Sequence, residues 1–250
     1  MQYVFRTFSQ VWNAARDLGI VDKPCPTKAK SFKLPKVDNE RQRYLTLDEE
    51  KLLLDAIKVR SSQAHDMALV SIDAGLRFKE IACLKWGCVD LETATLKVID
   101  SKGRDRYVPM TKRISELFKG MGNGGPSTLI FPDSEGKVQR QIPSSFVRAL
   151  VDAKLNEGVE NHKMKASFHS LRHAYASRLV QSGANLYKVQ RLLGHSTPKM
   201  TARYSKLADE NLRKAVTSME QSREIKESRG KKVVHLQRKI TGGYQGGPQS

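Results

Sequence analysis

The segments Leu192-Leu193-Gly194-His195 and Thr201-Ala202-Arg203-Tyr204 decide the fold of this chain. Gly194 is a natural end for a helix predicted over 185–193, because glycine is favoured just beyond a helix C-terminus. Thr197-Pro198 then begins a helix predicted over 198–207, which carries Tyr204 nine positions after His195. Alone, Tyr204 would be an ordinary surface tyrosine and a poor nucleophile, since an unperturbed phenol has a pKa of about 10.

Two arginine segments lie upstream, Gly75-Leu76-Arg77 and His169-Ser170-Leu171-Arg172. The spacing of His169 and Arg172 places both on one face of the first turn of a helix predicted over 169–182. Alone, each arginine is best explained by a surface salt bridge, and His195 by capping of helix carbonyls. Lys102, at the tip of a predicted hairpin, would alone be a solvated turn lysine.

Taken together, these residues suit attack on a phosphodiester. A guanidinium is always charged and forks onto two phosphate oxygens, so Arg77 and Arg172 could neutralise a pentavalent oxyanion. Cationic groups beside Tyr204 are expected to favour its phenolate, and a tyrosine activated in this way can form a covalent intermediate.

The remaining pattern predicts a mainly α protein with a small antiparallel β-sheet. Thr46-Leu47-Asp48-Glu49 has the spacing of a capping box and opens a helix predicted to about residue 59. Two short strands are predicted at 95–100 and 106–109, joined by the polar segment 101–105. Further helices are expected at 3–18, 62–74, 111–119, 143–156 and 208–227.

Bulk composition favours a polyanion as partner. The 250 residues carry 44 Lys+Arg against 26 Asp+Glu, a formal net charge of +18. Such a charge attracts phosphate backbones, although a ribosomal-type binder or an acidic-membrane binder would share it. No apolar run approaches the roughly 18 residues of a membrane span, and the N-terminus lacks the pattern of a signal peptide. The three cysteines are interpreted as reduced thiols of a cytosolic protein.

The motifs as a set resemble the tyrosine recombinase family, that is, the phage-integrase and Xer type of site-specific recombinase. The resemblance covers about residues 44–216. Its segments are residues 74–81, 101–103, 169–174, 192–195 and 201–204.

The resemblance implies a role for each matching residue. Arg77 and Arg172 would hold the non-bridging oxygens of the scissile phosphate, and His195 would hydrogen-bond that phosphate. Lys102 would protonate the departing 5′ oxygen, and His169 would assist proton transfer at Tyr204. Tyr204 would form a 3′-phosphotyrosyl bond that retains the phosphodiester energy, so neither ATP nor a metal or other cofactor is expected. Glu80 resembles the family's acidic supporting residue and would orient Arg77, with simple helix-surface pairing as the alternative.

The resemblance also implies a domain organisation. Residues 1–20 would hold the last helix of a truncated core-binding domain, 21–43 a basic linker, 44–216 the catalytic domain, and 217–250 a C-terminal helix and flexible basic tail. The helix at 208–227, with Leu212, Val216 and Met219 as anchors, could dock on a neighbouring protomer or pack on its own domain.

The expected partner is double-stranded DNA, bound by a tetramer, although an isolated domain is compatible with a monomer in solution. A cytoplasmic, bacterial or phage-encoded protein is expected, with no membrane partner. The alternatives are a catalytically idle DNA-binding remnant of an integrase and a type IB topoisomerase-like enzyme. The intact six-residue set argues against the remnant, and the close spacing of His195 and Tyr204 argues against the topoisomerase.

Overall fold

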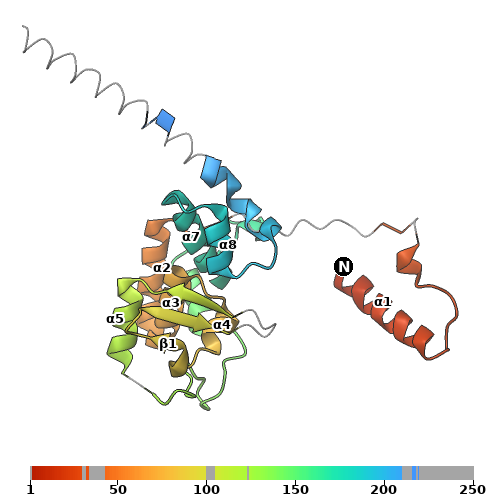
Figure 1. Cartoon of the computed structure of the whole chain (residues 1–250), viewed down its shortest axis with the longest axis horizontal. Helices are drawn as coiled ribbons and strands as arrows, with labels where there is room; N and C mark the ends of the chain where they lie inside the picture. The colour runs from red at the N-terminus through yellow and green to blue at the C-terminus, as the bar shows by residue number, and fades with distance from the viewer. Residues whose placement is uncertain are drawn as a thin grey trace, which may run out of the picture. The chain divides into compact units, whose positions relative to one another are not determined.

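The computed structural model describes residues 2–29, 32–33, 43–99, 105–122, 124–209, 216–217 and 219. They fall into two compact units, Met1–Arg41 and Gln42–Ser250 (Figure 1). No helix among these described residues is long and apolar enough to cross a membrane.

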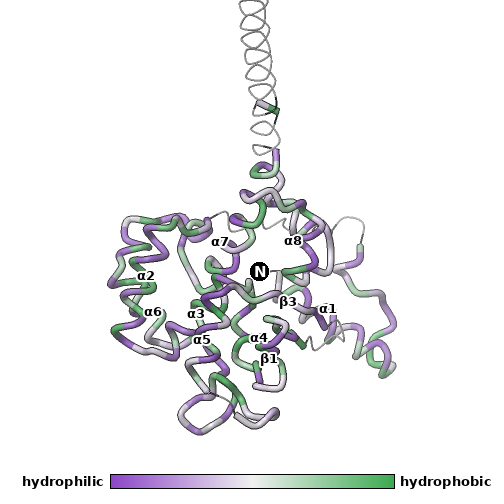
Figure 2. Tube along the Cα trace, turned by 60° about the vertical axis from the view of Figure 1, so that its left-hand side comes forward, coloured by the Kyte–Doolittle hydropathy of each residue, from purple (hydrophilic) through white to green (hydrophobic). Residues whose placement is uncertain are grey.

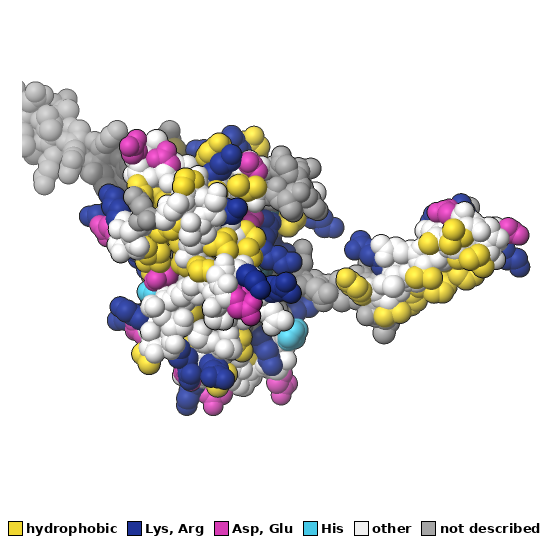
Figure 3. Space-filling model, turned by 90° about the horizontal axis from the view of Figure 1, so that it is seen from below, with side chains coloured by type: hydrophobic (Ala, Val, Ile, Leu, Met, Phe, Trp, Pro, Cys, Tyr) yellow, Lys and Arg dark blue, Asp and Glu magenta, His cyan; other side chains and the backbone are white. Residues whose placement is uncertain are grey.

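The first unit is one amphipathic helix with a segment folded back along it. Helix α1 spans Gln2–Asp17, as predicted, and a short 3-10 helix, η1, spans Pro26–Lys28. The returning segment is held by a hydrogen bond from Trp12 Nε1 to the Lys23 carbonyl (3.0 Å) and one between Ser9 and Thr27 (2.7 Å). Several apolar side chains of α1 remain exposed, and they gather along one side of the helix (Figure 3).

The second unit is built around a buried central helix. Helix α3 packs against α2, α4, α5, α6 and α7, and Figure 2 shows it between them. Most of its residues are buried, as expected of a helix enclosed by others. The helices are α2 (Leu47–Arg60), α3 (Ser62–Ala74), α4 (Phe78–Ala82), α5 (Lys112–Met121), α6 (Ser144–Asp152), α7 (Phe168–Gln181) and α8 (Leu186–Leu193).

A small antiparallel sheet lies beside these helices. Its order is β1 (Val89–Asp90), β2 (Thr95–Val98), β3 (Arg106–Pro109), and Leu96 is paired with Val108. Both of these side chains are fully buried, so the inner face of the hairpin joins the core. The prediction of a mainly α fold with a small antiparallel sheet is confirmed.

Local chemistry explains most helix boundaries. Thr46 accepts a hydrogen bond from the Glu49 amide, and Glu49 accepts one from the Thr46 amide, so the predicted capping box is present. The helix predicted over 143–156 ends early at Asp152, because Lys154 adopts a left-handed φ of 51° that terminates it. Strand β1 was not predicted, and the helix after Gly75 was expected without bounds, since two and five residues are too short to show a period.

Gly75 is required where α3 ends, and its replacement tests the packing at that point. Its φ is +65°, and a Cβ there would lie 2.4 Å from Tyr175 Cδ1. We expect Gly75→Ala to lower the free energy of unfolding by roughly 2–4 kcal/mol, from left-handed strain plus steric overlap. Gly158→Ala is the matched control, because Gly158 has φ +66° with nothing within 4 Å of the added Cβ. If urea unfolding shows that both variants lose the same free energy of unfolding, the close approach of Tyr175 to Gly75 is contradicted.

Candidate active site

The turn between α3 and α4 positions Arg77 and Glu80. Gly75 reverses the chain, and Arg77 stands immediately before α4 with Glu80 one turn later. The Arg77 amide donates to Glu80 Oε2 and the Arg77 guanidinium to Oε1, both at 2.8 Å. The contact predicted between these residues is therefore present. The Arg77 side chain is still 35% exposed, so its guanidinium is anchored while remaining open to a ligand.

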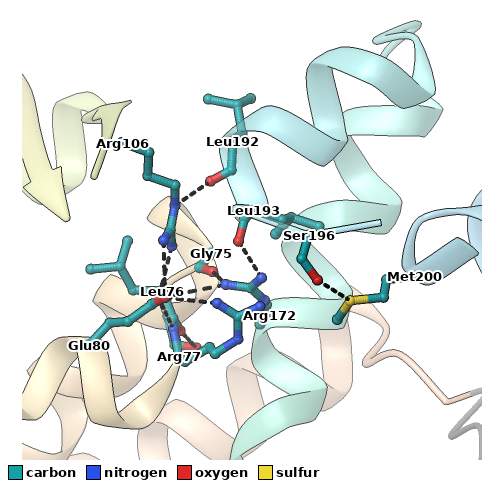
Figure 4. A network of polar contacts seen from close by, with 11 residues as sticks. Gly75, Leu76, Arg77, Glu80, Arg106, Arg172, Leu192, Leu193, Ser196 and Met200 are labelled. Carbon is teal, nitrogen blue, oxygen red and sulfur yellow. Dashed lines mark hydrogen bonds and ion pairs between the residues drawn. The ribbon is translucent and has the colours of Figure 1, made fainter. Parts of the chain in front are cut away.

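Arg172 lies deep in the same network, on the first turns of α7. Its guanidinium donates to the Gly75 carbonyl at 2.7 Å and to the Leu193 carbonyl, and it lies 3.7 Å from Glu80 Oε2 (Figure 4). The residue is 2% exposed. Burial, and then the nearby charge of Arg77, lower the pKa of Arg172 to about 9, which still leaves it charged at neutral pH. The buried cation of Arg172 thus joins the end of α3 to the end of α8.

Arg106 is a member of this network that the motifs did not identify. It donates to both Glu80 oxygens, at 3.0 and 2.8 Å, and its Nε donates to the Leu192 carbonyl at 2.9 Å. The strand period contained the signal, because Arg106 shares the inward face of β3 with the buried Val108. An arginine on a buried face needs an acidic partner, and Glu80 supplies it.

Among the residues that the structure describes, Glu80 is the one carboxylate that contacts all three arginines. Burial alone would raise the pKa of Glu80. The hydrogen bonds and charge of Arg106, the hydrogen bond from the Arg77 amide and the charge of Arg172 outweigh burial, and they lower the pKa to about 2. The carboxylate is therefore ionised throughout the physiological range and holds the arginines in fixed positions (Figure 4).

The segment predicted as a helix over 198–207 is built differently. It forms two 3-10 turns, Pro198–Met200 and Ala202–Tyr204, and residues 205–209 are helical. Hydrogen bonds of the i to i+3 type, such as Tyr204 N to the Thr201 carbonyl (3.0 Å), replace the α-helical pattern. Side chains three apart are eclipsed in a 3-10 turn, and accordingly Thr201 and Tyr204 are both buried. The prediction of one α-helix here is wrong.

Thr201 connects His195 to the segment that carries Tyr204. Its hydroxyl lies 2.8 Å from His195 Nδ1, and its carbonyl accepts from the Tyr204 amide. Burial, followed by the charges of Arg172, Arg77 and Arg203, lowers the pKa of His195 to about 3. His195 is therefore neutral at physiological pH and belongs to the electrostatic surroundings of both predicted arginines.

Tyr204 is buried rather than exposed. It is 4% exposed and forms a small hydrophobic cluster with Ala176, Val180, Val189 and Leu193 between α7 and α8. Burial raises the pKa of Tyr204 to about 12, although Arg203 and Arg172 act in the opposite direction. Neighbouring cations do favour the phenolate, as expected, but desolvation is the stronger effect in this arrangement and keeps the phenol protonated.

The two histidines of α7 lie against each other beside Tyr204. The rings of His169 and His173 meet edge to face with centroids 4.6 Å apart, and His173 Nδ1 lies 2.6 Å from the Tyr204 hydroxyl. His169 is exposed, whereas His173 is buried. His173 stands within the quoted motif but had been given no role, because sequence alone does not show which of the two imidazoles faces the tyrosine.

Five of the six predicted site residues thus come from distant segments into one neighbourhood. Glu80 contacts both Arg77 and Arg172, and Arg172 also contacts Leu193 at the end of α8. Thr201 joins His195 to the tyrosine segment, and His173 lies between His169 and Tyr204. Lys102 lies outside the described residues, as do most of the residues predicted to form the C-terminal helix. Val216 and Met219, two of its expected anchors, are exposed.

A groove of about 750 Å³ opens beside this neighbourhood, between β3 and α8. It is lined by Arg106, Lys188, Arg191, His195 and the exposed Tyr107 and Tyr187, among others. Cationic and aromatic groups therefore border the approach to His195. Within the described part of the chain, no three His, Cys, Asp or Glu residues are grouped as metal ligands.

Comparisons with known proteins agree with this architecture. The sequence is 29% identical over 191 residues to the tyrosine recombinase XerA of Thermococcus kodakarensis, covering 75% of this chain and 66% of that protein. The catalytic domain of bacteriophage HP1 integrase superposes with a TM-score of 0.52 at 24% identity, covering 70% of this chain and 93% of that domain. The Tn1549 transposon integrase, in complex with transposon right end DNA, superposes with a TM-score of 0.62 at 19% identity, covering 85% of this chain and 78% of that chain.

The two integrase structures share 24% and 19% of their residues with this chain, and at this identity the likeness establishes the fold alone. The chain spans just under two thirds of the length of the XerA relative, so the match does not extend over the whole of that recombinase. The sequence model of the phage integrase family matches residues 43–211, which contain every residue of the site described above. The fold and the family match therefore agree, and the chain belongs to the phage integrase family.

Proposed function

We propose that this chain is a site-specific DNA recombinase that cleaves and rejoins DNA through a 3′-phosphotyrosyl intermediate at Tyr204. One observation carries the proposal: the Glu80 carboxylate, with its side chain only 12% exposed, holds Arg77 and Arg172 together, and the tyrosine lies within the electrostatic reach of Arg172. Such a pair of guanidiniums suits a phosphate whose negative charge increases in the transition state.

The proposed chemistry assigns the phosphate to the cationic side of the site. Arg77 and Arg172 would bind the non-bridging oxygens, and His195, neutral and anchored by Thr201, would donate a hydrogen bond to one of them. These positive charges neutralise the oxyanion, which is the part that a metal ion plays in other phosphoryl-transfer sites.

The proposed proton transfers balance the cleavage step. The Tyr204 oxygen attacks phosphorus while the bond from phosphorus to the 5′ oxygen breaks. The phenolic proton passes to His169, and Lys102 gives a proton to the departing 5′ oxygen. The free 5′ hydroxyl of a partner strand then attacks the phosphotyrosine in the reverse reaction. No ATP is consumed, because the phosphotyrosyl bond retains the energy of the phosphodiester.

DNA binding would have to rearrange the tyrosine segment. Tyr204 is 4% exposed with a pKa of about 12, so in this arrangement it is neither accessible nor ionised at neutral pH. Its segment consists of short 3-10 turns, whose hydrogen bonds have poorer geometry than those of an α-helix, so the segment can be repositioned at lower cost. We therefore expect DNA binding to open access to the Tyr204 oxygen before cleavage, through a shift small enough to keep its contact with His173.

We propose that the chain acts as a tetramer on double-stranded DNA in the cytoplasm of a bacterial host. Helix α1 would be the last helix of a core-binding domain, and its exposed apolar side chains would be covered by the rest of that domain. The net charge of +18 supports DNA as the partner.

One experiment separates the proposed recombinase from a DNA-binding module and from a topoisomerase. A pool of nicked duplexes with a randomised core is incubated with the chain, with and without a second duplex that carries a free 5′ hydroxyl. Covalent adducts, followed by strand joining when the second duplex is present, are expected. Binding without any adduct would contradict cleavage activity. Relaxation of a supercoiled plasmid without enrichment of a core sequence would instead indicate a topoisomerase.

Affinity for DNA is predicted to depend steeply on salt. For each phosphate neutralised by Lys or Arg, the logarithm of the binding constant should fall by about 0.9 per tenfold rise in salt. Anisotropy titrations of a labelled duplex between 50 and 200 mM KCl, roughly the range over which such losses are typical, measure the slope. A flat response would argue against binding through the DNA backbone.

A further inference from the structure

The side chains of Arg203, His173 and Tyr204 form a short relay of polar contacts. Arg203 Nη1 lies 3.3 Å from His173 Nε2, and His173 Nδ1 lies 2.6 Å from the Tyr204 hydroxyl. His173 is 6% exposed and Tyr204 is 4% exposed, so the central part of the relay is shielded from water. Both nitrogens of one imidazole are thus engaged, one by a cation and the other by the proposed nucleophile.

The chemistry of arginine decides where the imidazole proton lies. A guanidinium has only donors, so His173 Nε2 must accept from Arg203. A ring nitrogen that accepts carries no proton, and the imidazole is therefore neutral with its proton on Nδ1. The hydrogen bond at 2.6 Å is then donated by Nδ1 to the Tyr204 oxygen.

We propose that His173 is a positioning residue for the nucleophile: it donates from Nδ1 to the Tyr204 oxygen, and Arg203 fixes the tautomer that makes this possible. The inference rests on the proposed function, in which Tyr204 attacks DNA. In this arrangement His173 is not the base that removes the phenolic proton, because its Nδ1 already carries one. It stabilises the phenolate that forms when another group takes that proton.

The surroundings keep His173 in this neutral form. His169 and Arg172 face it from its own helix, Arg203 and Tyr204 from the tyrosine segment, and His195 from the loop after α8. None of these groups is acidic at neutral pH, and burial together with the cations lowers the pKa of His173 to about 3. The donor on Nδ1 is therefore present over the whole range in which DNA cleavage would be assayed.

Two replacements separate the two ring nitrogens. His173→Asn places an amide nitrogen near the position of Nδ1 and keeps a donor for Tyr204. His173→Gln places an amide oxygen near Nε2, so it keeps an acceptor for Arg203 and loses the donor. Loss of a hydrogen bond to a charged oxygen predicts a cleavage rate roughly 10- to 100-fold lower for His173→Gln, in single turnover on the adduct-forming duplexes. His173→Asn should stay within about threefold of the parent, and the rise of rate with pH should move to higher pH only in His173→Gln.

A measurement on the DNA-free chain tests the tautomer without relying on catalysis. Nitrogen-15 NMR of histidine-labelled protein should show His173 as a neutral imidazole protonated on Nδ1, with the exposed His162 as the reference for an unconstrained ring. Acetylation of Tyr204 by N-acetylimidazole, quantified by peptide mass spectrometry, should be slow in the parent and faster in His173→Gln.

The outcomes distinguish this proposal from the proposed function. A proton on His173 Nε2, or equal cleavage rates for the Asn and Gln variants, would overturn the positioning role. If instead the tautomer is as stated but Tyr204→Phe still forms the adduct, the assignment of the nucleophile fails while the relay stands. Thermal unfolding of both variants shows whether each remains folded under the assay conditions.

Discussion

Replacing Tyr204 with phenylalanine is expected to abolish the covalent protein–DNA complex while leaving DNA binding within about twofold of the parent. The hydroxyl is the only group removed, and it supplies the attacking oxygen. The ring remains in its cluster between α7 and α8, and only the hydrogen bond to His173 is lost. The free energy of unfolding should therefore fall by about 1 kcal/mol, the typical value of one hydrogen bond. Denaturing gels of nicked duplexes measure the adduct, and anisotropy measures binding.

Tyr187→Phe is the matched control for this variant. Tyr187 lies on α8, is 64% exposed and borders the groove beside His195, so its replacement should leave the adduct intact. A covalent band from Tyr204→Phe at the parent level would remove Tyr204 from the mechanism. Loss of the band from Tyr187→Phe alone would move the nucleophile to α8.

Replacing Glu80 with glutamine is expected to have the largest effect on stability. The change is isosteric but leaves Arg77, Arg106 and Arg172 without the carboxylate that holds them. Breaking a buried ion pair from one side typically costs about 3–5 kcal/mol in the free energy of unfolding. Adduct formation should fall by a factor of 10² or more, on the order of what a misplaced oxyanion donor costs.

The role of the Glu80 carboxylate can also be measured through the pH dependence of stability. The pKa of Glu80 is lowered from 4.5 to about 2, so its contribution is fully present above pH 4.5 and is lost as the pH falls through 2. The shift corresponds to about 3 kcal/mol. Urea unfolding of the parent between these pH values should show this loss, and Glu80→Gln should lack it. Glu116→Gln, in an exposed pair with Lys112, is the control expected to behave as the parent. Parallel pH curves for the parent and Glu80→Gln would contradict the role of the carboxylate.

The sequence predicted those parts of the fold that are governed by local chemistry. The capping box at Thr46, the left-handed glycines after α3 and α8, and the alternation of β2 and β3 are each properties of a few adjacent residues. Strand β1 was missed, and the helix after Gly75 was given no bounds, because two and five residues are too short to show a period. The 3-10 turns at 198–204 were missed because the burial of Thr201 and Tyr204, rather than their propensity, decides that conformation.

Motif spacing singled out residues that the fold brings together, but it did not reveal their electrostatics. Motif spacing identified Arg77, Arg172 and Tyr204, which the fold brings together from distant segments. The pKa of Tyr204 depends on how completely α7 and α8 enclose it, and no spacing carries that information. Arg106 could have been found from the inward face of its strand, whereas the choice between His169 and His173 required the structure.

The most direct test of the account locates the phosphate itself. The covalent complex formed on nicked duplexes is digested with nuclease and protease, and the nucleotide-bearing peptide is sequenced by tandem mass spectrometry. We expect a 3′-phosphonucleotide attached to the oxygen of Tyr204. A nucleotide attached to any other residue, or joined to Tyr204 through a 5′ phosphate, would contradict it.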